Sequence, residues 1–340
     1  MALFKRQRLG IDLGTVNTVI YLEGKGIVLR EPTILAIDNE TKEIKAYGKE
    51  AYELIGKTSD KIDFVYPIQS GVIHHFTYAK KLIDHFIRKA SIGRFGRSEV
   101  IVCAPSNISK VERQSFVEVV KDLGIYRAMI IDEPFAAAIG SDIDVLEPVG
   151  RLLVDIGGGS TDIVLISYGE IINKVTLNFG GRYFDQLIAL HVRQNLKMVI
   201  SEHTAEEIKT TIGNAMYGKD DLNQTMPVSG KDLATRNPIE KEVSEALVAE
   251  ALNEAINKLI NGIRELLSVI PPELSADILT QGIYLSGGGS LLKRLPDRIT
   301  SEIHLPVNLV NTPMDAVAVG AGKLFNQLHK YSQRVERNNR

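Results

Sequence analysis

The chain has 340 residues, enough for two domains of ordinary size, and 44% of them are apolar, which can fill two hydrophobic cores. Its 40 basic and 42 acidic residues nearly cancel, so a protein that coats nucleic acid is not expected. One cysteine excludes an internal disulfide, no apolar run approaches the ~20 residues that span a bilayer, and the N-terminus lacks a secretory signal, so we expect a cytoplasmic protein.

The first part of the chain is expected to alternate strands and helices. Residues 28–37 and 43–47 predict strands, and a short helix follows near residues 49–52. Apolar residues at helical spacing predict a longer helix over residues 77–89.

A strand at residues 100–104 contains Cys103, which we interpret as a small core thiol because no second cysteine can bind a metal with it. Ser109 is suited to cap the helix that follows. Strand, helix and strand in this order favour a mixed α/β sheet with right-handed crossovers.

The longest helical pattern runs from about Pro238 to Ile270. Asn237-Pro238 is a start signal, and Pro271-Pro272 is a stop. Apolar residues recur along it every three or four positions, as in a helix that packs on a core. An amphipathic helix that binds a partner is the alternative.

One motif occurs twice, at residues 10–18 and 154–162. In each copy an apolar strand ends in an aspartate, Asp12 or Asp155, and glycine and hydroxyl residues then turn the chain into a second apolar strand. Glycines at such a turn let backbone N–H groups approach phosphate oxygens. Two copies indicate a duplicated fold whose halves bind one polyphosphate.

Two further segments belong with these turns. Glu133 precedes a small-residue helix that leads to the second copy, and its carboxylate either faces a cleft between the halves or interacts with the helix dipole. Gly287, Gly288 and Gly289 follow an apolar strand. Their backbone either lies against a flat ligand or only makes a tight connection.

These four segments, in this order, resemble the actin, Hsp70 and sugar-kinase ATPase superfamily, and residues 8–328 are similar to the MreB family of bacterial actins. The resemblance implies an α/β class with a duplicated, actin-like (ribonuclease H-like) fold, in which two domains surround a nucleotide cleft. Each domain would carry a small outer subdomain.

The resemblance also places the domain boundaries. Domain I would span residues 1–145, with its outer subdomain at about 31–66, and would be completed by a C-terminal helix at about 313–340. Domain II would span residues 146–312, with its outer subdomain at about 179–237.

The implied ligands are ATP or ADP and Mg²⁺. Asp12 and Asp155 would hold the metal through water, because a small hard cation prefers oxygen ligands. Glu133 would orient the attacking water with Thr161 beside it, since phosphoryl transfer depends on positioning and charge. The other implied nucleotide contacts are Gly14, Thr15, Val16 and Asn17 on one side of the phosphates, Gly157, Gly158, Gly159 and Ser160 on the other, Gly287, Gly288 and Gly289 at the adenosine, and Glu206 and Lys209 on a helix that closes over base and ribose.

Some residues depart from the pattern or have a simpler interpretation. Glu206 and Lys209 are also spaced as an exposed i,i+3 ion pair. Relatives commonly carry Thr-Thr-Glu where this chain has Ser160-Thr161-Asp162, and His75 stands where an acidic or amide residue is frequent. These differences predict a slow ATPase rather than a loss of nucleotide binding.

Both ends of the chain suggest attachment to an anionic membrane surface, at ~1 kcal/mol for each basic residue. The tail at residues 330–340 has four basic residues, although a disordered, solvated tail is the alternative. The other candidate membrane residues are Leu3, Phe4, Lys5, Arg6 and Arg8 at the N-terminus, and Ile92 and Phe95 between Arg94 and Arg97 in a loop.

We therefore expect a slowly ATP-hydrolysing bacterial actin, cytoplasmic and peripheral at the inner face of the cell membrane, that forms cytoskeletal filaments for cell shape or related work. Subunits would stack head to tail in protofilaments, paired antiparallel, with paralogues and membrane proteins as further partners and no nucleic acid. A small-molecule kinase of this fold should show a general-base aspartate, and a chaperone should continue into a β-rich domain; the sequence offers neither feature.

Overall fold

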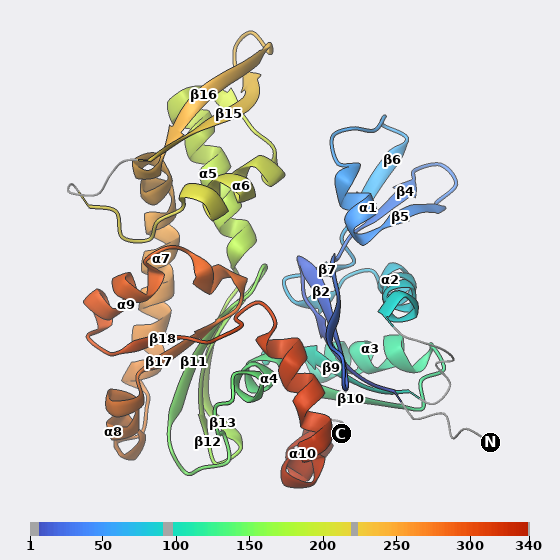
Figure 1. Cartoon of the computed structure of the whole chain (residues 1–340), viewed down its shortest axis with the longest axis vertical. Helices are drawn as coiled ribbons and strands as arrows, with labels where there is room; N and C mark the ends of the chain where they lie inside the picture. The colour runs from blue at the N-terminus through green and yellow to red at the C-terminus, as the bar shows by residue number, and fades with distance from the viewer. Residues whose placement is uncertain (1–6, 91–97, 219–223, 339–340) are drawn as a thin grey trace. The chain divides into compact units, whose positions relative to one another are not determined.

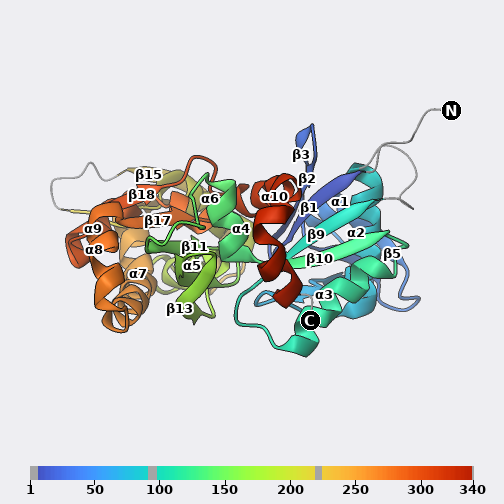
Figure 2. The same ribbon diagram turned by 90° about the horizontal axis from the view of Figure 1, so that it is seen from below.

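The computed structural model describes residues 7–90, 98–218 and 224–338. Its contacts divide the chain into two compact units, whose elements are labelled in Figures 1 and 2. Unit 1 comprises Met1–Val149, Ile166–Ile172 and Val310–Arg340, and unit 2 comprises Gly150–Leu165 and Asn173–Leu309.

The main sheet of unit 1 has the strand order β10-β9-β1-β2-β3 in the described residues. Its strands are β1 (Arg8–Leu13), β2 (Asn17–Leu22), β3 (Gly26–Pro32), β9 (Glu99–Ala104) and β10 (Arg127–Asp132). Strands β1, β9 and β10 run parallel, whereas β1, β2 and β3 form an antiparallel meander. Because parallel strands end at the same edge of a sheet, Asp12 and Asp132 lie at one edge.

Both faces of this sheet are covered, and every residue of β9 is buried. Val100 and Val102 pack on one face in a cluster with Phe116 from α3 (Lys110–Lys121) and with residues of α2 (Phe76–Ala90). Cys103 points to the other face, where its sulfur lies 3.8 Å from the Val317 carbonyl oxygen of α10 (Ala316–Asn338). The prediction of a buried core thiol is confirmed.

Helix α3 begins with reciprocal hydrogen bonds, as its sequence predicts. The Ser109 hydroxyl accepts from the Glu112 N–H at 3.2 Å, and the Glu112 carboxylate accepts from the Ser109 N–H at 2.7 Å. This capping box satisfies two donors that a helix start otherwise leaves unpaired.

Helix α4 (Glu133–Gly140) lies beside α10 (Figure 2), and the two helices pack closely at two glycines. A Cβ at Gly140 would collide with the carbonyl oxygen of Ala316, and one at Gly320 with that of Ala136. Only glycine lets the two backbones approach so closely. The crossing fixes the direction of α4, which begins at Glu133.

The outer part of unit 1 is a small sheet, β5-β4-β6, with α1 beside it. Its core consists of Ile34, Ala36, Ala46 and Ala51. The strand predicted for residues 28–37 is two strands, because the chain leaves β3 after Pro32 and enters β4 at Leu35. The elements are β4 (Leu35–Asp38), β5 (Ile44–Tyr47), α1 (Gly48–Glu53) and β6 (Ile62–Val65), and the chain returns through β7 (Ile68–Gln69) and β8 (Val72–Ile73).

The main sheet of unit 2 has the order β13-β12-β11-β17-β18 among the described strands. Strands β11, β12 and β13 stand first in the sequence, and two parallel strands, β17 and β18, extend the sheet beyond β11, as β9 and β10 do beyond β1. The strands are β11 (Arg151–Ile156), β12 (Thr161–Ser167), β13 (Glu170–Leu177), β17 (Ile283–Ser286) and β18 (Val307–Leu309). The matching orders confirm the predicted duplication.

The long helix predicted from Pro238 is wrong at its start. Pro238 opens a strand, β16 (Pro238–Ser244), which pairs with β15 (Thr225–Asp232), as Figure 1 shows. The helix α7 begins at Glu245, where the Ser244 hydroxyl accepts from the Leu247 N–H at 3.3 Å. Pro238 stands first in an edge strand, where its missing N–H costs nothing. Helix α7 spans Glu245–Ser268. The other elements of this part of the chain are α5 (Gly181–Leu196), β14 (Met198–Val199), α6 (Glu202–Ile212) and α8 (Pro272–Gln281).

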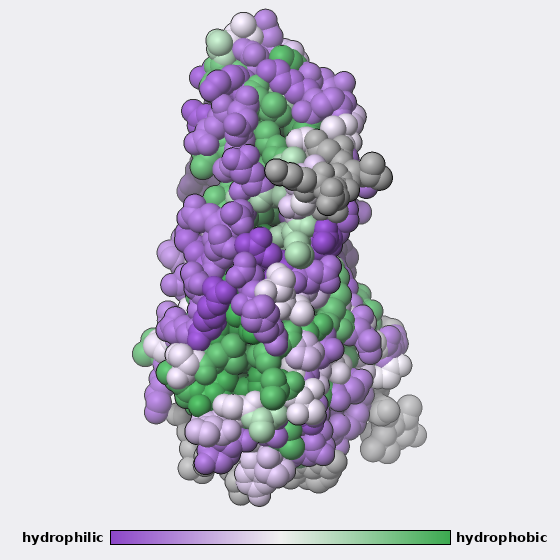
Figure 3. Space-filling view, turned by 90° about the vertical axis from the view of Figure 1, so that its left-hand side faces the viewer, coloured by the Kyte–Doolittle hydropathy of each residue, from purple (hydrophilic) through white to green (hydrophobic). Residues whose placement is uncertain are grey.

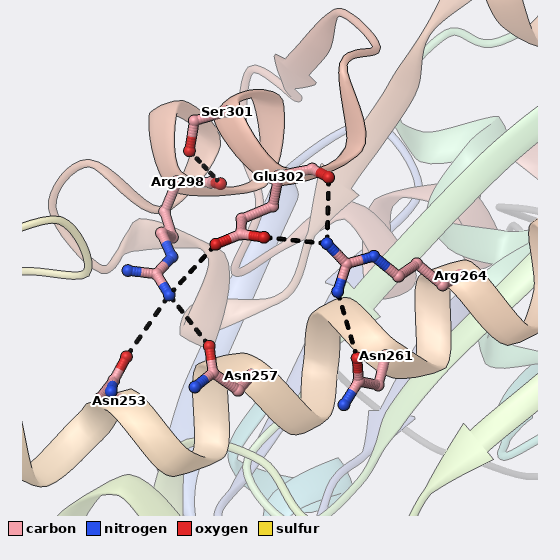
Figure 4. A network of polar contacts seen from close by, with 7 residues as sticks. All are labelled: Asn253, Asn257, Asn261, Arg264, Arg298, Ser301 and Glu302. Carbon is pink, nitrogen blue, oxygen red and sulfur yellow. Dashed lines mark hydrogen bonds and ion pairs between the residues drawn. The ribbon is translucent and has the colours of Figure 1, made fainter.

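Helix α9 (Leu295–Ile303) is held on α7 by the polar contacts in Figure 4. Glu302 accepts from Arg264 of α7 at 2.9 Å and forms an ion pair with Arg298 at 3.5 Å. Arg298 also donates to Asn257 of α7 at 3.0 Å. The apolar face of α7 is buried in the core of unit 2, so its predicted packing role is confirmed.

The face shown in Figure 3 carries apolar surface in its lower half. Among the exposed apolar residues of unit 2 are Val269, which follows α7, and Leu279 of α8, whose side chains are 57% and 67% exposed. No described helix is both long and apolar enough to cross a membrane.

Candidate functional site

The first glycine turn, residues 12–17, joins β1 to β2. The Gly14 N–H donates to the Asn17 carbonyl at 3.1 Å and closes the turn. A Cβ at Gly14 would lie 2.7 Å from that oxygen, so the turn requires glycine. Thr33 supports the turn from outside: its hydroxyl donates to the Gly14 carbonyl at 2.8 Å, and its N–H donates to the Val16 carbonyl at 2.8 Å.

The hydroxyl of Thr15 is prepared to donate a hydrogen bond. Its oxygen accepts from the Gly71 N–H at 2.9 Å. Since that bond uses a lone pair, the hydroxyl hydrogen remains for an acceptor such as a phosphate oxygen. Gly71, which the sequence analysis missed as a support, has φ +78°, a conformation that favours glycine.

Carboxylates gather at the edge of the unit 1 sheet where β1 and β10 end. One strand, β9, separates Asp12 from Asp132, so their backbones are roughly 10 Å apart. Arg113 of α3 forms an ion pair with Asp132 at 2.6 Å. Glu133 follows in the first turn of α4 and is partly exposed. Its place in the first turn of α4 allows an interaction with the helix dipole, and its predicted role at a cleft stays a prediction.

The second glycine turn, residues 155–160, joins β11 to β12 and repeats the first. The Gly157 N–H donates to the Ser160 carbonyl at 3.0 Å, the same three-residue offset as in the first turn. The start of α5 rests on this turn, because Gly181 and Arg182 donate to the carbonyls of Gly157 and Gly158, each at 2.9 Å. The positive end of the α5 dipole therefore lies at the turn, where it would stabilise an anion.

The carboxylate of Asp155, at the start of this turn, has a strongly raised pKa. It is buried, and its Oδ1 atom has no hydrogen-bond partner. Burial raises the pKa of Asp155 to about 7, the negative charge of Asp162 adds to the rise, and Ser286 opposes it. A buried carboxylate with an unsatisfied oxygen is costly unless a cation or donor completes it.

The third glycine segment lies directly on the second turn. Gly287 has φ +79°, and a Cβ on it would lie 2.7 Å from Oδ1 of Asp155. The chain then enters a short 3-10 helix, Gly288–Leu291, in which the Ser290 hydroxyl donates to the Gly287 carbonyl at 2.6 Å. The structure therefore brings Asp155 and the segment predicted for adenosine into contact within unit 2.

Lys209 of α6 does not behave as an exposed surface residue. Its ammonium forms an ion pair with Asp185 of α5 at 2.8 Å and donates to the Gly181 carbonyl at 3.1 Å. Burial raises the pKa of Asp185 to about 6, although Lys209 opposes the rise. Asp185 was missed from the sequence because it stands on another helix, 24 positions from Lys209. Glu206 lies one turn before Lys209 and is partly exposed.

Thr161 is fully buried at the start of β12. Its hydroxyl donates to the Phe179 carbonyl at 2.8 Å. This bond ties the second turn to the segment before α5. The hydroxyl hydrogen is therefore committed to the backbone, and the role of Thr161 beside an attacking water stays a prediction.

Several predicted features have no described geometry. Leu3, Phe4, Ile92 and Phe95 lie outside the described residues. The tail at residues 330–338 is helical, as the end of α10. Within the described part of the chain, no cluster of three or more histidine, cysteine or acidic side chains is arranged to hold a metal. A metal here would rely on one or two carboxylates with water and phosphate, which is usual for Mg²⁺.

Comparison with known proteins agrees with this architecture. The family described as MreB/Mbl protein matches residues 6–333. The cell shape-determining protein Mbl of Bacillus subtilis (strain 168) is 35% identical over 327 residues, covering 96% of this chain and 98% of the relative. The cell shape-determining protein MreB of Escherichia coli (strain K12) is 36% identical over 326 residues, covering 94% and 93%.

A solved structure also matches almost the whole chain. The crystal structure of MreB5 of Spiroplasma citri bound to AMPPNP is similar with a TM-score of 0.91 and 30% identity, over 97% of this chain and 99% of that one. The predicted actin-like fold is confirmed by this match. The chain therefore belongs to the MreB/Mbl family.

Proposed function

We propose that this chain is a bacterial actin that binds ATP with Mg²⁺, hydrolyses it slowly and polymerises into filaments at the membrane. Asp155 carries the nucleotide part of the proposal: it is buried with an unsatisfied oxygen beside a turn that repeats the hydrogen bond of the turn after Asp12. The likeness to an MreB structure bound to AMPPNP supports the same ligand class.

In this proposal the two glycine turns bind the phosphates of one nucleotide. Thr15 would donate its remaining hydroxyl hydrogen to a phosphate oxygen, and the α5 dipole would favour the negative charge at Gly157 and Gly158. Gly287 and Gly288 would lie against the adenosine, with Glu206 and Lys209 beside it. The ion pair with Asp185 would hold the Lys209 side chain in place before the nucleotide binds.

The residues at the turns also fit a magnesium ion. Oδ1 of Asp155 lacks a partner, and Asp12 ends the equivalent strand of the other unit. Both would hold hydrated Mg²⁺ bound to the terminal phosphates, and the ion would neutralise charge there. Binding a cation would remove the electrostatic cost of ionising Asp155, so Asp155 should lose its proton when the metal–nucleotide complex binds.

Glu133 would orient the water that attacks the terminal phosphate. Its backbone is fixed because α4 is locked against α10 at Gly140 and Gly320. Arg113 compensates Asp132, the neighbouring carboxylate, which keeps the local negative charge lower. A turnover limited by positioning, with Thr161 committed to Phe179, is consistent with the slow ATPase expected from the sequence.

Filament formation and membrane attachment rest on family membership and on surface properties. Apolar surface of the kind that Val269 and Leu279 expose is a frequent site of protein association. Head-to-tail protofilaments, antiparallel pairing and contacts with paralogues or membrane proteins remain part of the proposal. The basic and apolar residues at the chain's ends would bind the inner face of the cell membrane weakly and in a salt-dependent way.

The first test measures nucleotide binding and phosphate release. Fluorescent ATP should bind with an affinity that Mg²⁺ increases, and phosphate release should be slow. The wild-type protein failing to bind ATP at millimolar concentration with Mg²⁺ would refute the proposal.

The second test addresses assembly. Electron microscopy of the protein with ATP and Mg²⁺ on anionic lipid should show filaments, and the protein should sediment with anionic liposomes at low salt and less at high salt. An absence of sedimentation at low salt would refute membrane attachment without affecting nucleotide binding.

A further inference from the structure

A buried polar cluster joins three segments of unit 2 at the carboxylate of Glu245, the first residue of α7. Oε1 of Glu245 accepts from the Asn214 side-chain amide at 2.8 Å and from the Lys293 ammonium at 2.9 Å. Glu245 and Asn214 are each 1% exposed, whereas the Lys293 side chain is about half exposed. We call Asn214, Glu245 and Lys293 the α7 clamp.

The clamp connects the two elements proposed to hold the nucleoside. Asn214 follows α6, which carries Glu206 and Lys209. Lys293 follows the 3-10 helix that begins at the glycines Gly287 and Gly288. The backbones of the two segments also meet. The Ala215 N–H donates to the Lys293 carbonyl at 2.8 Å, and Asn214 and Lys293 form a parallel β-bridge.

Close packing beside the clamp leaves little room for the segments to slide. A Cβ on Gly213, at the end of α6, would lie 2.9 Å from the Leu292 side chain. Separately from the clamp, α9 is held on α7 by Glu302, Arg264 and Arg298 (Figure 4). Helix α7 is therefore the common support for α6 and for the glycine segment.

Glu245 is held in its charged form. Burial acts to raise its pKa, but hydrogen bonds from Lys293, Asn214 and the Gln224 N–H outweigh burial, and the pKa lies below its usual value. A buried carboxylate held by several donors has one favoured geometry, and the loss of one donor is costly because the remaining charge stays buried. The clamp is thus a rigid joint rather than a surface ion pair.

We propose that Glu245 and Lys293 are positioning residues that set the spacing between α6 and the Gly287–Gly289 segment, and thereby the affinity for the nucleoside part of the nucleotide. Neither residue needs to touch the nucleotide. The inference rests on the proposed nucleotide binding. It adds that the two turns bind the phosphates, whereas the clamp preorganises the contacts with the nucleoside.

The test compares a ligand that carries a nucleoside and phosphates with one that carries phosphates alone. The affinity for ADP with Mg²⁺ is measured with a fluorescent ADP analogue, and inorganic tripolyphosphate with Mg²⁺ is measured by competition. Lys293→Met removes the ammonium at a half-exposed position, and Glu245→Gln removes the buried charge. Lys293→Arg retains the ion pair as a conservative control, and Glu302→Gln weakens the α7–α9 contact away from the clamp. Circular dichroism and thermal unfolding check that each variant is folded.

We expect about tenfold weaker ADP binding in Lys293→Met and Glu245→Gln, with tripolyphosphate binding unchanged. Lys293→Arg and Glu302→Gln should bind ADP as the wild type does. Wild-type ADP affinity in a folded Lys293→Met protein, or equal losses for both ligands, would overturn the inference, even if Glu245→Gln fails to fold. If the wild type binds ADP but the clamp variants are unaffected, only the clamp is wrong; if the wild type binds neither ligand, the proposed function fails and the clamp with it.

Discussion

Replacing Asp155 with asparagine should stabilise the nucleotide-free protein while it impairs Mg²⁺-dependent binding. Asparagine keeps the size of the side chain but cannot ionise. The wild-type carboxylate is buried beside Asp162, and its Oδ1 has no partner. The negative charge that the proposed metal requires therefore lowers the free energy of unfolding of the nucleotide-free protein, because a buried charge without a partner is costly.

The magnitude follows from the pKa. Burial, aided by Asp162, raises the pKa of Asp155 from 3.8 to about 7. At about 1.4 kcal/mol per pH unit, ionising the folded protein costs about 4 kcal/mol more than ionising the unfolded chain. Between pH 4 and 7 the folded state binds the extra proton, so this contribution to the free energy of unfolding falls as the pH rises. Above about pH 7 it no longer changes.

The assay is chemical unfolding of the wild type and Asp155→Asn from pH 4 to 9, with a chelator and without nucleotide. The free energy of unfolding of the variant should exceed that of the wild type by an amount that grows about 1.4 kcal/mol per pH unit up to pH 7 and then stays constant. In parallel, Mg²⁺ should no longer strengthen ATP binding to the variant. Stability curves that run parallel from pH 4 to 7 would refute the argument that Asp155 is protonated in the empty protein.

Three further predictions test other parts of the structure. Glu133→Ala should slow phosphate release on the order of 100-fold and leave ATP binding intact; unchanged turnover in a phosphate-release assay would remove Glu133 from its role. Gly320→Ala should lower the free energy of unfolding by about 2 kcal/mol, because its methyl group would force α10 from α4; a melting temperature equal to that of the wild type would contradict this crossing. Ser109→Ala should cost about 1 kcal/mol in denaturant unfolding by removing one half of the α3 capping box, whereas Ser115→Ala, within α3, is the control that should cost less.

Local sequence signals predicted the elements that depend on local physics. The glycine turns after Asp12 and Asp155 combine apolar strands with turn residues, and both form where the sequence places them. Ser109 caps its helix for the same reason, since its partner is three residues away. The error at Pro238 shows the limit: the signal for a helix start was present, but pairing with β15 decided the outcome.

Contacts between distant segments could not be predicted in this way. The spacing of Glu206 and Lys209 indicated a local ion pair, whereas in the structure Lys209 pairs with Asp185 on another helix. Asn214 and Lys293 stand 79 positions apart in the sequence and meet only because α6, α7 and α9 pack together. No pattern in one sequence marks such residues, because polar side chains that the fold buries look the same in the sequence as polar side chains that face solvent.

The two carboxylates, Asp155 and Glu245, show how the same unit uses burial in opposite ways. Glu245 is satisfied by Lys293 and Asn214, so its charge is stable in the empty protein and can only fix a geometry. Asp155 lacks a partner for Oδ1, so its charge becomes favourable only when a cation arrives. Binding of a metal–nucleotide complex should therefore stabilise the folded protein by more than contact with the phosphates alone would give. A ligand that binds only the folded state adds stability that grows with the ratio of its concentration to its Kd, and the cation held by Asp155 lowers that Kd. The gain should disappear in Asp155→Asn and persist in Glu302→Gln, which places the coupling between nucleotide and stability at one carboxylate.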